Sequence, residues 1–353
     1  LRIRILDGEK VVALLGSSLN VTELLRMDVA DVPLTARQNP AIEVTVNSLE
    51  TRPVKGVVRF DNRYFTASLR NEIQEIPFQI PAKGQTTLTI PVSRDLVNLS
   101  TAYEVPVTAR TEDGKEITAR AEVAFRACER APGKIVIDGD LSDWKLTERT
   151  PFSMEREFAT WGKAYGGPDD LSAKVYTLWD DETLYFAAVV KDDSFVNNAN
   201  DIEIWLSDNI HFGFHPWGWK LGSKINTGYY REHLGLCQDG VARIFRVGNP
   251  AGGPASAEGA SIAVKKAKDG YVYEWRYPRT AVFPMELVPG KRFRLSMGVW
   301  DRDWIRADGT VARENPDKDS TVKLSNLGGL NFSCFLANVD SRPEKWREFV
   351  LTE

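Results

Sequence analysis

Short segments that alternate apolar and polar residues, each closed by a turn, fill the chain from residue 36 to residue 127 without a sustained helical periodicity. In residues 41–47, Ile42, Val44 and Val46 fall on one face of a strand, because strand side chains alternate between two faces. Further strands are predicted over residues 54–60, 74–80, 86–92, 103–110 and 116–125, with hairpin-type turns at residues 81–84 and 112–115. Strands of this number and spacing predict an immunoglobulin-like β-sandwich.

The stretches on either side of these strands carry different patterns. Residues 1–6 and 11–15 predict a hairpin, and residues 21–27 predict one or two turns of helix. Residues 127–134 include a Pro-Gly pair and are interpreted as a linker. We therefore expect two domains, at residues 1–128 and 129–353, each with enough chain to bury a core.

The second half of the chain predicts another set of strands. Residues 173–179 and 183–190 predict a hairpin whose second strand is apolar on both faces, as is typical of a central strand covered on both sides. Residues 201–206 alternate cleanly and also predict a strand. The same pattern continues over residues 210–214, 242–247, 261–265, 271–277 and 292–300. Since no βαβ alternation is present, we predict a second antiparallel sandwich and an all-β fold class for the whole chain.

Composition excludes several classes of protein. The 45 Lys and Arg residues are interspersed among 49 Asp and Glu residues, so no clustered basic surface for nucleic acid is expected. No apolar stretch reaches the roughly 18–20 residues that span a bilayer, so no membrane span is expected. The chain begins at Leu1, and we interpret it as a mature or excised piece. Cys128, Cys237 and Cys334 are an odd set without a CxxC pair, which favours buried thiols over a disulfide.

Several motifs occur together, and in order, after residue 134. They are IDGDLSDW (137–144), AKVYTLWDDETLY (173–185), VKDD (190–193), DIEIWL (201–206), GYVYEW (270–275) and GVWD (298–301). This series resembles the family 9 carbohydrate-binding modules and their DOMON-type relatives over about residues 134–353. The resemblance implies a sugar-binding β-sandwich that is secreted, periplasmic or on the cell surface, is often stabilised by calcium, and is usually attached to a larger glycan-degrading enzyme.

The chain departs from that family where a sugar ring is held. Family members that bind free sugar ends clamp the ring between two tryptophans, one shortly before the position of Glu203 and one near the C-terminal end. Here residues 194–200 contain no tryptophan, and residues 325–333 contain only Phe332 among the aromatic residues.

Candidate ligand-binding residues begin with Glu203, which matches a ligand-contacting carboxylate of the family. Alternation along the predicted strand places Asp201 and Trp205 on its face. Sugars require carboxylates, amides or Arg for their hydroxyls and an aromatic plane for the ring. The alternative is a solvated face without a ligand.

The most unusual segment is HFGFHPWGW, residues 211–219. In a strand, His211, Gly213 and His215 share a face, and Trp217 and Trp219 are candidates to replace the missing clamp. The alternative is an aromatic loop that packs over the end of the sandwich.

A second polar and aromatic cluster comprises Asp301, Arg302, Asp303 and Trp304, with a solvated turn as its alternative, and Trp300 is a further candidate ligand residue. The stripe of Tyr271, Tyr273, Trp275 and Tyr277 is interpreted as sheet packing instead.

Metal binding is expected at carboxylates. Asp138, Asp140, Asp192 and Asp193 are candidates for Ca²⁺, which takes several oxygen ligands. Alternatives are a transition-metal site of His211, His215, His233 and Glu203, or haem, although Met297 has the parity of a core residue. No organic cofactor is expected.

The leading hypothesis is non-catalytic carbohydrate binding by the C-terminal sandwich, with the N-terminal domain as a spacer or docking module. The expected partners are a glycan and a catalytic domain of the same or a partner chain. No nucleophile, metalloprotease, P-loop or dinucleotide motif is present, and no catalytic residue is assigned. One alternative is a glycan hydrolase with a carboxylate or metal site around Glu203, His211 and His215. A further alternative is a structural or protein-interaction module.

Overall fold

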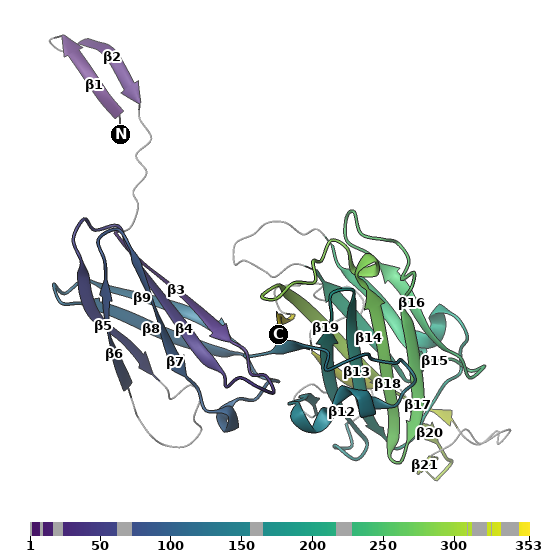
Figure 1. The fold of residues 1–353 in the computed structure, drawn as a ribbon. Helices are drawn as coiled ribbons and strands as arrows, with labels where there is room; N and C mark the ends of the chain where they lie inside the picture. The colour runs from purple at the N-terminus through teal and green to yellow at the C-terminus, as the bar shows by residue number, and fades with distance from the viewer. Residues whose placement is uncertain are drawn as a thin grey trace. The chain divides into compact units, whose positions relative to one another are not determined.

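The computed structural model of the chain describes residues 2–7, 10–16, 24–61, 73–155, 165–216, 228–308, 310–312, 323–325, 327–332 and 346–353. The chain forms two compact units (Figure 1). Unit 1 comprises Leu1–Ala30, Ile42–Ile90 and Tyr103–Val123, and unit 2 comprises Asp31–Ala41, Pro91–Ala102 and Ala124–Glu353. The expected division at residue 128 stays a prediction. Among the described residues, no helix is both long enough and apolar enough to cross a bilayer.

Unit 1 contains two short sheets and a separate hairpin. The sheets have the strand orders β3-β4-β7 and β6-β5-β8-β9, and the hairpin pairs β1 with β2, as predicted. The strands are β1 (Arg2–Asp7), β2 (Lys10–Gly16), β3 (Leu25–Val32), β4 (Ala41–Ser48), β5 (Val54–Asp61), β6 (Ile73–Ile80), β7 (Gln85–Pro91), β8 (Tyr103–Thr111) and β9 (Glu116–Val123). The helical prediction for residues 21–27 is wrong from residue 25 onward, because β3 begins at Leu25.

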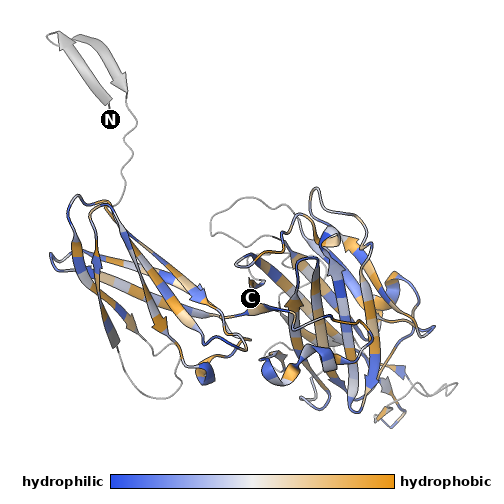
Figure 2. Ribbon diagram, in the orientation of Figure 1, coloured by the Kyte–Doolittle hydropathy of each residue, from blue (hydrophilic) through white to orange (hydrophobic). Residues whose placement is uncertain are grey.

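Alternation produces the core of unit 1. Ile42, Val44 and Val46 of β4 are fully buried, as are Val105 and Val107 of β8, while the residues between them are more exposed. Apolar and polar residues therefore alternate along these strands (Figure 2). The six strand segments predicted between residues 41 and 125 all correspond to strands of the structure.

Unit 2 is built on one long sheet. Its strand order is β16-β15-β14-β19-β24-β10-β12-β13-β18-β17, with β11 beside β12 and β23 beside β19. The strands are β10 (Ala127–Arg130), β11 (Phe152–Met154), β12 (Leu171–Trp179), β13 (Thr183–Asp192), β14 (Asn209–His215), β15 (Tyr230–Leu236), β16 (Ala242–Gly248), β17 (Ser261–Ala267), β18 (Gly270–Pro278), β19 (Arg292–Asp301), β23 (Gly328–Phe332) and β24 (Arg347–Thr352). A small sheet adds β20 (Trp304–Ile305), β21 (Val311–Ala312) and β22 (Lys323–Leu324). The 3₁₀ helices are η2 (Arg94–Leu96), η3 (Leu141–Trp144), η4 (Leu146–Glu148), η6 (Ile202–Leu206) and η7 (Arg279–Val282).

The long sheet folds over into two layers. The rings of Phe186 in β13 and Phe212 in β14 lie 4.8 Å apart between centroids, although these two strands are not neighbours in the sheet. Trp275 and Tyr277 of β18 join the same core, which confirms that this aromatic stripe packs inside the sandwich. Met297 is also buried in this core, as its parity predicted.

The interpretation of residues 127–134 as a linker is wrong for their first half. Residues Ala127–Arg130 form β10, which pairs in parallel with β12 and with β24 and so joins the two layers. Cys128 in this strand is buried and unpaired, and Cys237 is likewise a buried free thiol, as expected. Cys334 lies outside the described residues.

Strand β13 is buried on both faces, as its sequence predicts. Leu184, Phe186 and Ala188 face the main core, whereas Tyr185 and Ala187 face a second, smaller core. The smaller core is closed by residues from the IDGDLSDW motif and its surroundings, with Ile135 and Trp144 buried in it.

One buried carboxylate holds in place the segment that closes the smaller core. Glu274 of β18 is fully buried, and its Oε2 accepts hydrogen bonds from the backbone N–H of Asp138 (2.9 Å) and Gly139 (2.8 Å). Its Oε1 accepts one from Trp144 Nε1 at 2.8 Å. Gly139 has a φ of +77°, and a Cβ there would lie 2.6 Å from Cβ of Lys265, so the turn requires glycine.

Substitution Glu274→Ala removes the carboxylate that accepts all three hydrogen bonds. The N–H groups of Asp138, Gly139 and Trp144 then lose this acceptor. We expect the free energy of unfolding of unit 2 to fall by about 3 kcal/mol. All ten tryptophans lie at or after Trp144, so tryptophan fluorescence in a guanidinium titration follows unit 2. The matched control is Glu182→Ala, because that side chain is 68% exposed and pairs with Arg279 at the surface. Equal midpoints for the two variants would contradict this role of Glu274.

Candidate functional site

The layer of β14, β15 and β19 has one apolar face and one polar face. Ile210, Phe212 and Phe214 of β14 point into the main core. The intervening residues His211, Gly213 and His215 therefore share the opposite face, as predicted. We call this opposite face of β14, β15 and β19 the polar sheet face.

Two histidines and a tryptophan meet on the polar sheet face. His211 pairs in register with His233 of β15, and their rings lie 4.1 Å apart between centroids. The ring of Trp300 in β19 lies 5.1 Å from that of His211. His211 and Trp300 are only 4% and 2% exposed, so these rings form a packed group.

Burial keeps both histidines neutral. It lowers the pKa of His211 well below its usual range, and the neighbouring His233 and Arg231 act in the same direction. Burial, followed by the charge of Arg231, lowers the pKa of His233 to about 4. A neutral imidazole offers one donor and one acceptor, the combination that a hydroxyl group needs.

Small residues lie beside these rings. Gly298 is the partner of His211 on β19, and Gly213 pairs with Ser296 on one side and with Arg231 on the other. Gly213, Ser296 and Gly298 are all buried, so these small residues form the part of the polar sheet face against which the rings pack.

The segment around Glu203 differs from its prediction. Residues Ile202–Leu206 form the 3₁₀ helix η6, so the predicted strand over residues 201–206 is wrong. Asp201 begins the helix, since its side chain accepts the N–H of Glu203 at 2.9 Å and its carbonyl accepts that of Ile204. Strand alternation therefore does not place Asp201, Glu203 and Trp205 on one face.

Helix η6 nevertheless lies against β15. A Cβ on Gly235 of β15 would lie 3.2 Å from Cδ1 of Ile204, the buried residue of the helix. Glu203 is exposed, and Trp205 is 39% exposed. Trp217 and Trp219 lie outside the described residues.

Five aspartates converge where strands of both layers end. Ligand oxygens of Asp170, Asp301 and Asp303 lie within 4.8 Å of one another, and so do those of Asp192, Asp208 and Asp301. Asp192 ends β13, Asp301 ends β19 and Asp208 precedes β14. We call these five residues the aspartate cluster.

The aspartate cluster brings carboxylates into a buried place. Asp208, Asp301 and Asp303 are each at most 2% exposed. Burial, and next the charges of Asp192 and Asp301, raise the pKa of Asp208 well above its usual range. Its carboxylate is held by the backbone N–H groups of Val196 (2.5 Å) and Arg302 (2.7 Å).

The donor set of this cluster fits calcium. All its ligand atoms are carboxylate oxygens, which Ca²⁺ prefers, and each set of three aspartates can supply part of the six to eight ligands it takes. Among the described groups of three or more possible ligands, neither set includes a histidine or Glu203. The alternative transition-metal site of His211, His215, His233 and Glu203 is therefore not formed by these residues.

The structure separates the four predicted metal ligands. Asp192 belongs to the aspartate cluster, and Asp193 follows it in the chain. Asp138 and Asp140 instead shape the turn before η3. Asp138 accepts the N–H of Asp140 at 2.8 Å, and Asp140 accepts that of Ser142 at 3.1 Å. Their assignment as calcium ligands with Asp192 and Asp193 stays a prediction.

The remaining predicted ligand residues divide between the two regions. Trp300 lies on the polar sheet face, whereas Asp301 belongs to the aspartate cluster. The backbone N–H of Trp304 donates to Ser194 Oγ at 3.2 Å, near the strand end that carries Asp192. His215 is buried at the far end of β14, in register with Arg294. Sequence reasoning missed Asp170 and Asp208, whose only signal is a carboxylate next to a predicted strand.

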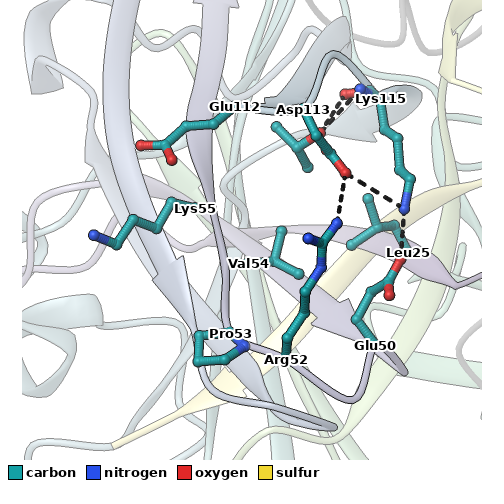
Figure 3. A pocket seen from close by; sticks show the side chains of 10 residues that line it. Leu25, Glu50, Arg52, Pro53, Val54, Lys55, Glu112, Asp113 and Lys115 are labelled. Atoms are coloured by element: carbon teal, nitrogen blue, oxygen red, sulfur yellow. Dashed lines mark hydrogen bonds and ion pairs between the residues drawn. The ribbon is translucent and has the colours of Figure 1, made fainter.

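A small hollow in unit 1 is lined by charged side chains that form ion pairs with one another (Figure 3). It has a volume of about 120 Å³. Lys115 pairs with Glu50 at 2.5 Å and with Asp113 at 3.7 Å, and Arg52 pairs with Asp113 at 3.2 Å. Ligand pockets usually reach about 300–1,000 Å³, so this group of ion pairs joins two loops and is no candidate site.

Comparison with known proteins gives a family match. The sequence model described as "Carbohydrate family 9 binding domain-like" matches residues 137–321, just over half of the chain. This match covers the motifs from which the resemblance was predicted and confirms it.

A curated relative is Endo-1,4-beta-xylanase A of Thermotoga neapolitana, which is 32% identical over 145 residues. That alignment covers 40% of this chain and 12% of the xylanase.

Two similar solved structures are of a family 9 carbohydrate-binding module from Caldicellulosiruptor kristjanssonii. One is in complex with glucose (TM-score 0.42, 15% identity) and one with cellotriose (TM-score 0.43, 14% identity). Each alignment covers 64% of this chain and 94% of the other.

The neutral histidines predict a dependence of stability on pH. Because the pKa of His233 falls from 6.5 in the unfolded chain to about 4 in the folded one, only the unfolded chain gains a proton between these values. Stability is therefore complete above pH 6.5 and decreases as the pH falls toward 4, by up to about 3 kcal/mol from this residue.

The comparison that isolates this effect is His233→Gln against the unsubstituted protein. Guanidinium unfolding at pH 7 and at pH 4.5 should show a smaller loss of stability in the variant. The same loss in both proteins would show that His233 is protonated equally in the folded and unfolded chains.

Proposed function

Because the chain belongs to the Carbohydrate family 9 binding domain-like family, we propose that unit 2 binds a glycan on its polar sheet face without cleaving it. The observation that carries the proposal is the group of Trp300, His211 and His233 beside the small residues of β14 and β19. An aromatic plane and neutral hydrogen-bonding groups are two of the features that a sugar site requires.

Each group in this proposal has a physical role. The indole of Trp300 stacks on the apolar face of a sugar ring. The neutral imidazoles of His211 and His233 exchange hydrogen bonds with hydroxyls, and the guanidinium of Arg231 donates to ring or hydroxyl oxygens. Trp300 thereby replaces one of the two family tryptophans that this chain lacks, and Trp217 and Trp219 are candidates for the other.

We further propose that the aspartate cluster holds Ca²⁺. The ion would neutralise carboxylates whose mutual repulsion raises the pKa of Asp208. Asp301 directly follows Trp300, and Asp208 comes three residues before His211. The cluster therefore fixes the ends of the two strands that carry the proposed sugar contacts.

Roles can also be proposed for unit 1 and for the chain as a whole. Unit 1, with seven strands in two sheets, is proposed as an immunoglobulin-like spacer or docking module. The chain spans about 12% of the length of the curated xylanases it matches. We propose that it attaches a glycan-degrading catalytic domain, of the same or a partner chain, to its substrate outside the cell, with xylan as the first glycan to test.

A glycan array followed by calorimetric titration tests sugar binding. We expect binding to at least one plant polysaccharide, and at least a tenfold loss of affinity in Trp300→Leu and in Arg231→Ala, about 1.4 kcal/mol each. The matched control is Trp205→Ala, since this exposed tryptophan lies on η6 and not on the polar sheet face. Thermal unfolding of each variant shows whether it is folded.

Two outcomes would contradict the proposed site. One is the absence of binding to every glycan, with and without calcium. The other is a loss of affinity in Trp205→Ala while the folded Trp300 and Arg231 variants bind normally, which would move the site to η6.

Calcium binding is tested by thermal unfolding with Ca²⁺ and with a chelator. A calcium concentration one hundred times the dissociation constant adds about 2.7 kcal/mol, which is a rise in Tm of about 5–10 °C for a unit of this size. We expect Asp301→Asn to abolish most of this rise, because Asp301 belongs to both aspartate sets. The double variant Asp138→Asn, Asp140→Asn should retain it. The reverse pattern would place the ion at the turn before η3.

A further inference from the structure

Besides the small hollow of unit 1, a second hollow lies in unit 2. Its lining includes no residue of the polar sheet face. It has a volume of about 500 Å³, within the range of ligand pockets. Its lining comes from the end of β13, the residues after it, and the turn between β17 and β18. The lining residues are Asp169, Lys191, Asp192, Asp193, Ser194, Phe195, Lys266, Ala267, Lys268, Asp269, Gly270 and Tyr271. We call this hollow the strand-end pocket.

An aromatic pair forms one wall of the strand-end pocket. The rings of Phe195 and Tyr271 stack with centroids 3.8 Å apart and planes inclined by 24°. Both side chains are only partly buried, and Tyr271 also packs against the main core. The stacking holds the two rings in fixed positions, which gives a ligand a rigid apolar surface at little entropic cost.

The other walls carry charges of both signs. Lys191 pairs with Asp169, while Lys266, Lys268 and Asp269 are exposed around the opening. Ammonium groups donate hydrogen bonds and carboxylates accept them, whereas a hydroxyl does both. A wall of mixed sign therefore suits a neutral polyhydroxyl compound in preference to one that carries a net charge.

We infer that the strand-end pocket is a second saccharide site, which takes a neutral pyranose in preference to an acidic sugar. The inference rests on the proposed function for the class of ligand, and on the pocket's own lining for its place and charge preference. The two proposed sites lie on opposite layers of the sandwich, because β13, β17 and β18 belong to one layer and β14, β15 and β19 to the other.

Two sites on one module change how it holds a polymer. A chain bound at one site raises the local concentration of sugar units near the other, so that weak sites together give a longer-lived attachment. This arrangement suits a module that retains an enzyme on an extended glycan.

A backbone NMR titration of the full chain reads the two sites separately. The probes are xylotriose, cellotriose, laminaritriose and mannotriose, with methyl glucuronoside as the acidic sugar. We expect the amides of Ser194 and Gly270 to shift with at least one neutral trisaccharide, as a set distinct from those of His211 and Gly298. The acidic sugar should bind this pocket at least tenfold more weakly.

Two variants and one control assign the shifts. Tyr271→Leu keeps apolar volume but removes the aromatic surface, and Lys191→Met removes an ammonium group that is already partly exposed. Each should weaken the Ser194 and Gly270 response at least fivefold while the His211 and Gly298 response is unchanged. Lys174→Met, an exposed lysine of β12 outside the pocket, should change neither.

The failures of the two proposals differ. Shifts at His211 and Gly298 alone would overturn the strand-end pocket and leave the polar sheet face in place. Shifts at Ser194 and Gly270 that persist in both variants, or that are strongest with methyl glucuronoside, would also overturn it. The absence of shifts with every probe would overturn both sites, and shifts at the pocket alone would support it while removing the sheet face.

Discussion

Burial of β13 on both faces is the constraint on which unit 2 depends. A strand without a polar face needs two covers, and the chain supplies them from distant segments. The second layer of the folded sheet covers one face. The segment around Ile135 and Trp144 covers the other, and the carboxylate of Glu274 holds that segment by three hydrogen bonds. The burial of Trp144 in the IDGDLSDW motif is therefore explained by packing.

The same packing determines which residues lie on the polar sheet face. Because β14, β15 and β19 pack their apolar residues into the main core with β13 and β18, their alternate residues lie on the opposite side, the polar sheet face. His211, His233 and Trp300 occupy these positions. The aspartates gather at the strand ends for a related reason, because strands of both layers finish side by side there. Fold and site thus follow from one arrangement of strands.

Sequence reasoning predicted most of this fold, because alternation and turn signals are local. It placed the segments of β4–β9, β12–β14 and β16–β19, and it recognised the doubly buried strand. It failed at residues 201–206, where an alternating sequence forms a 3₁₀ helix because Asp201 caps it. It also missed β15, which follows a Gly-rich stretch, and the parallel strand β10, whose pairing depends on the distant β24.

The candidate site was only partly predictable. The shared face of His211 and His215 followed from strand alternation alone. Trp300 and Asp301 were named from the GVWD motif (298–301). The aspartate cluster was not predictable as a set, because its members come from four separate places in the chain and only the fold brings them together. The most direct test of the account is a crystal structure grown with calcium and a xylo-oligosaccharide bound by the protein in solution. The account predicts a sugar ring on Trp300 beside His211 and His233, with an ion at Asp192, Asp208 and Asp301; a sugar bound only at η6, or an ion only at Asp138 and Asp140, would contradict it.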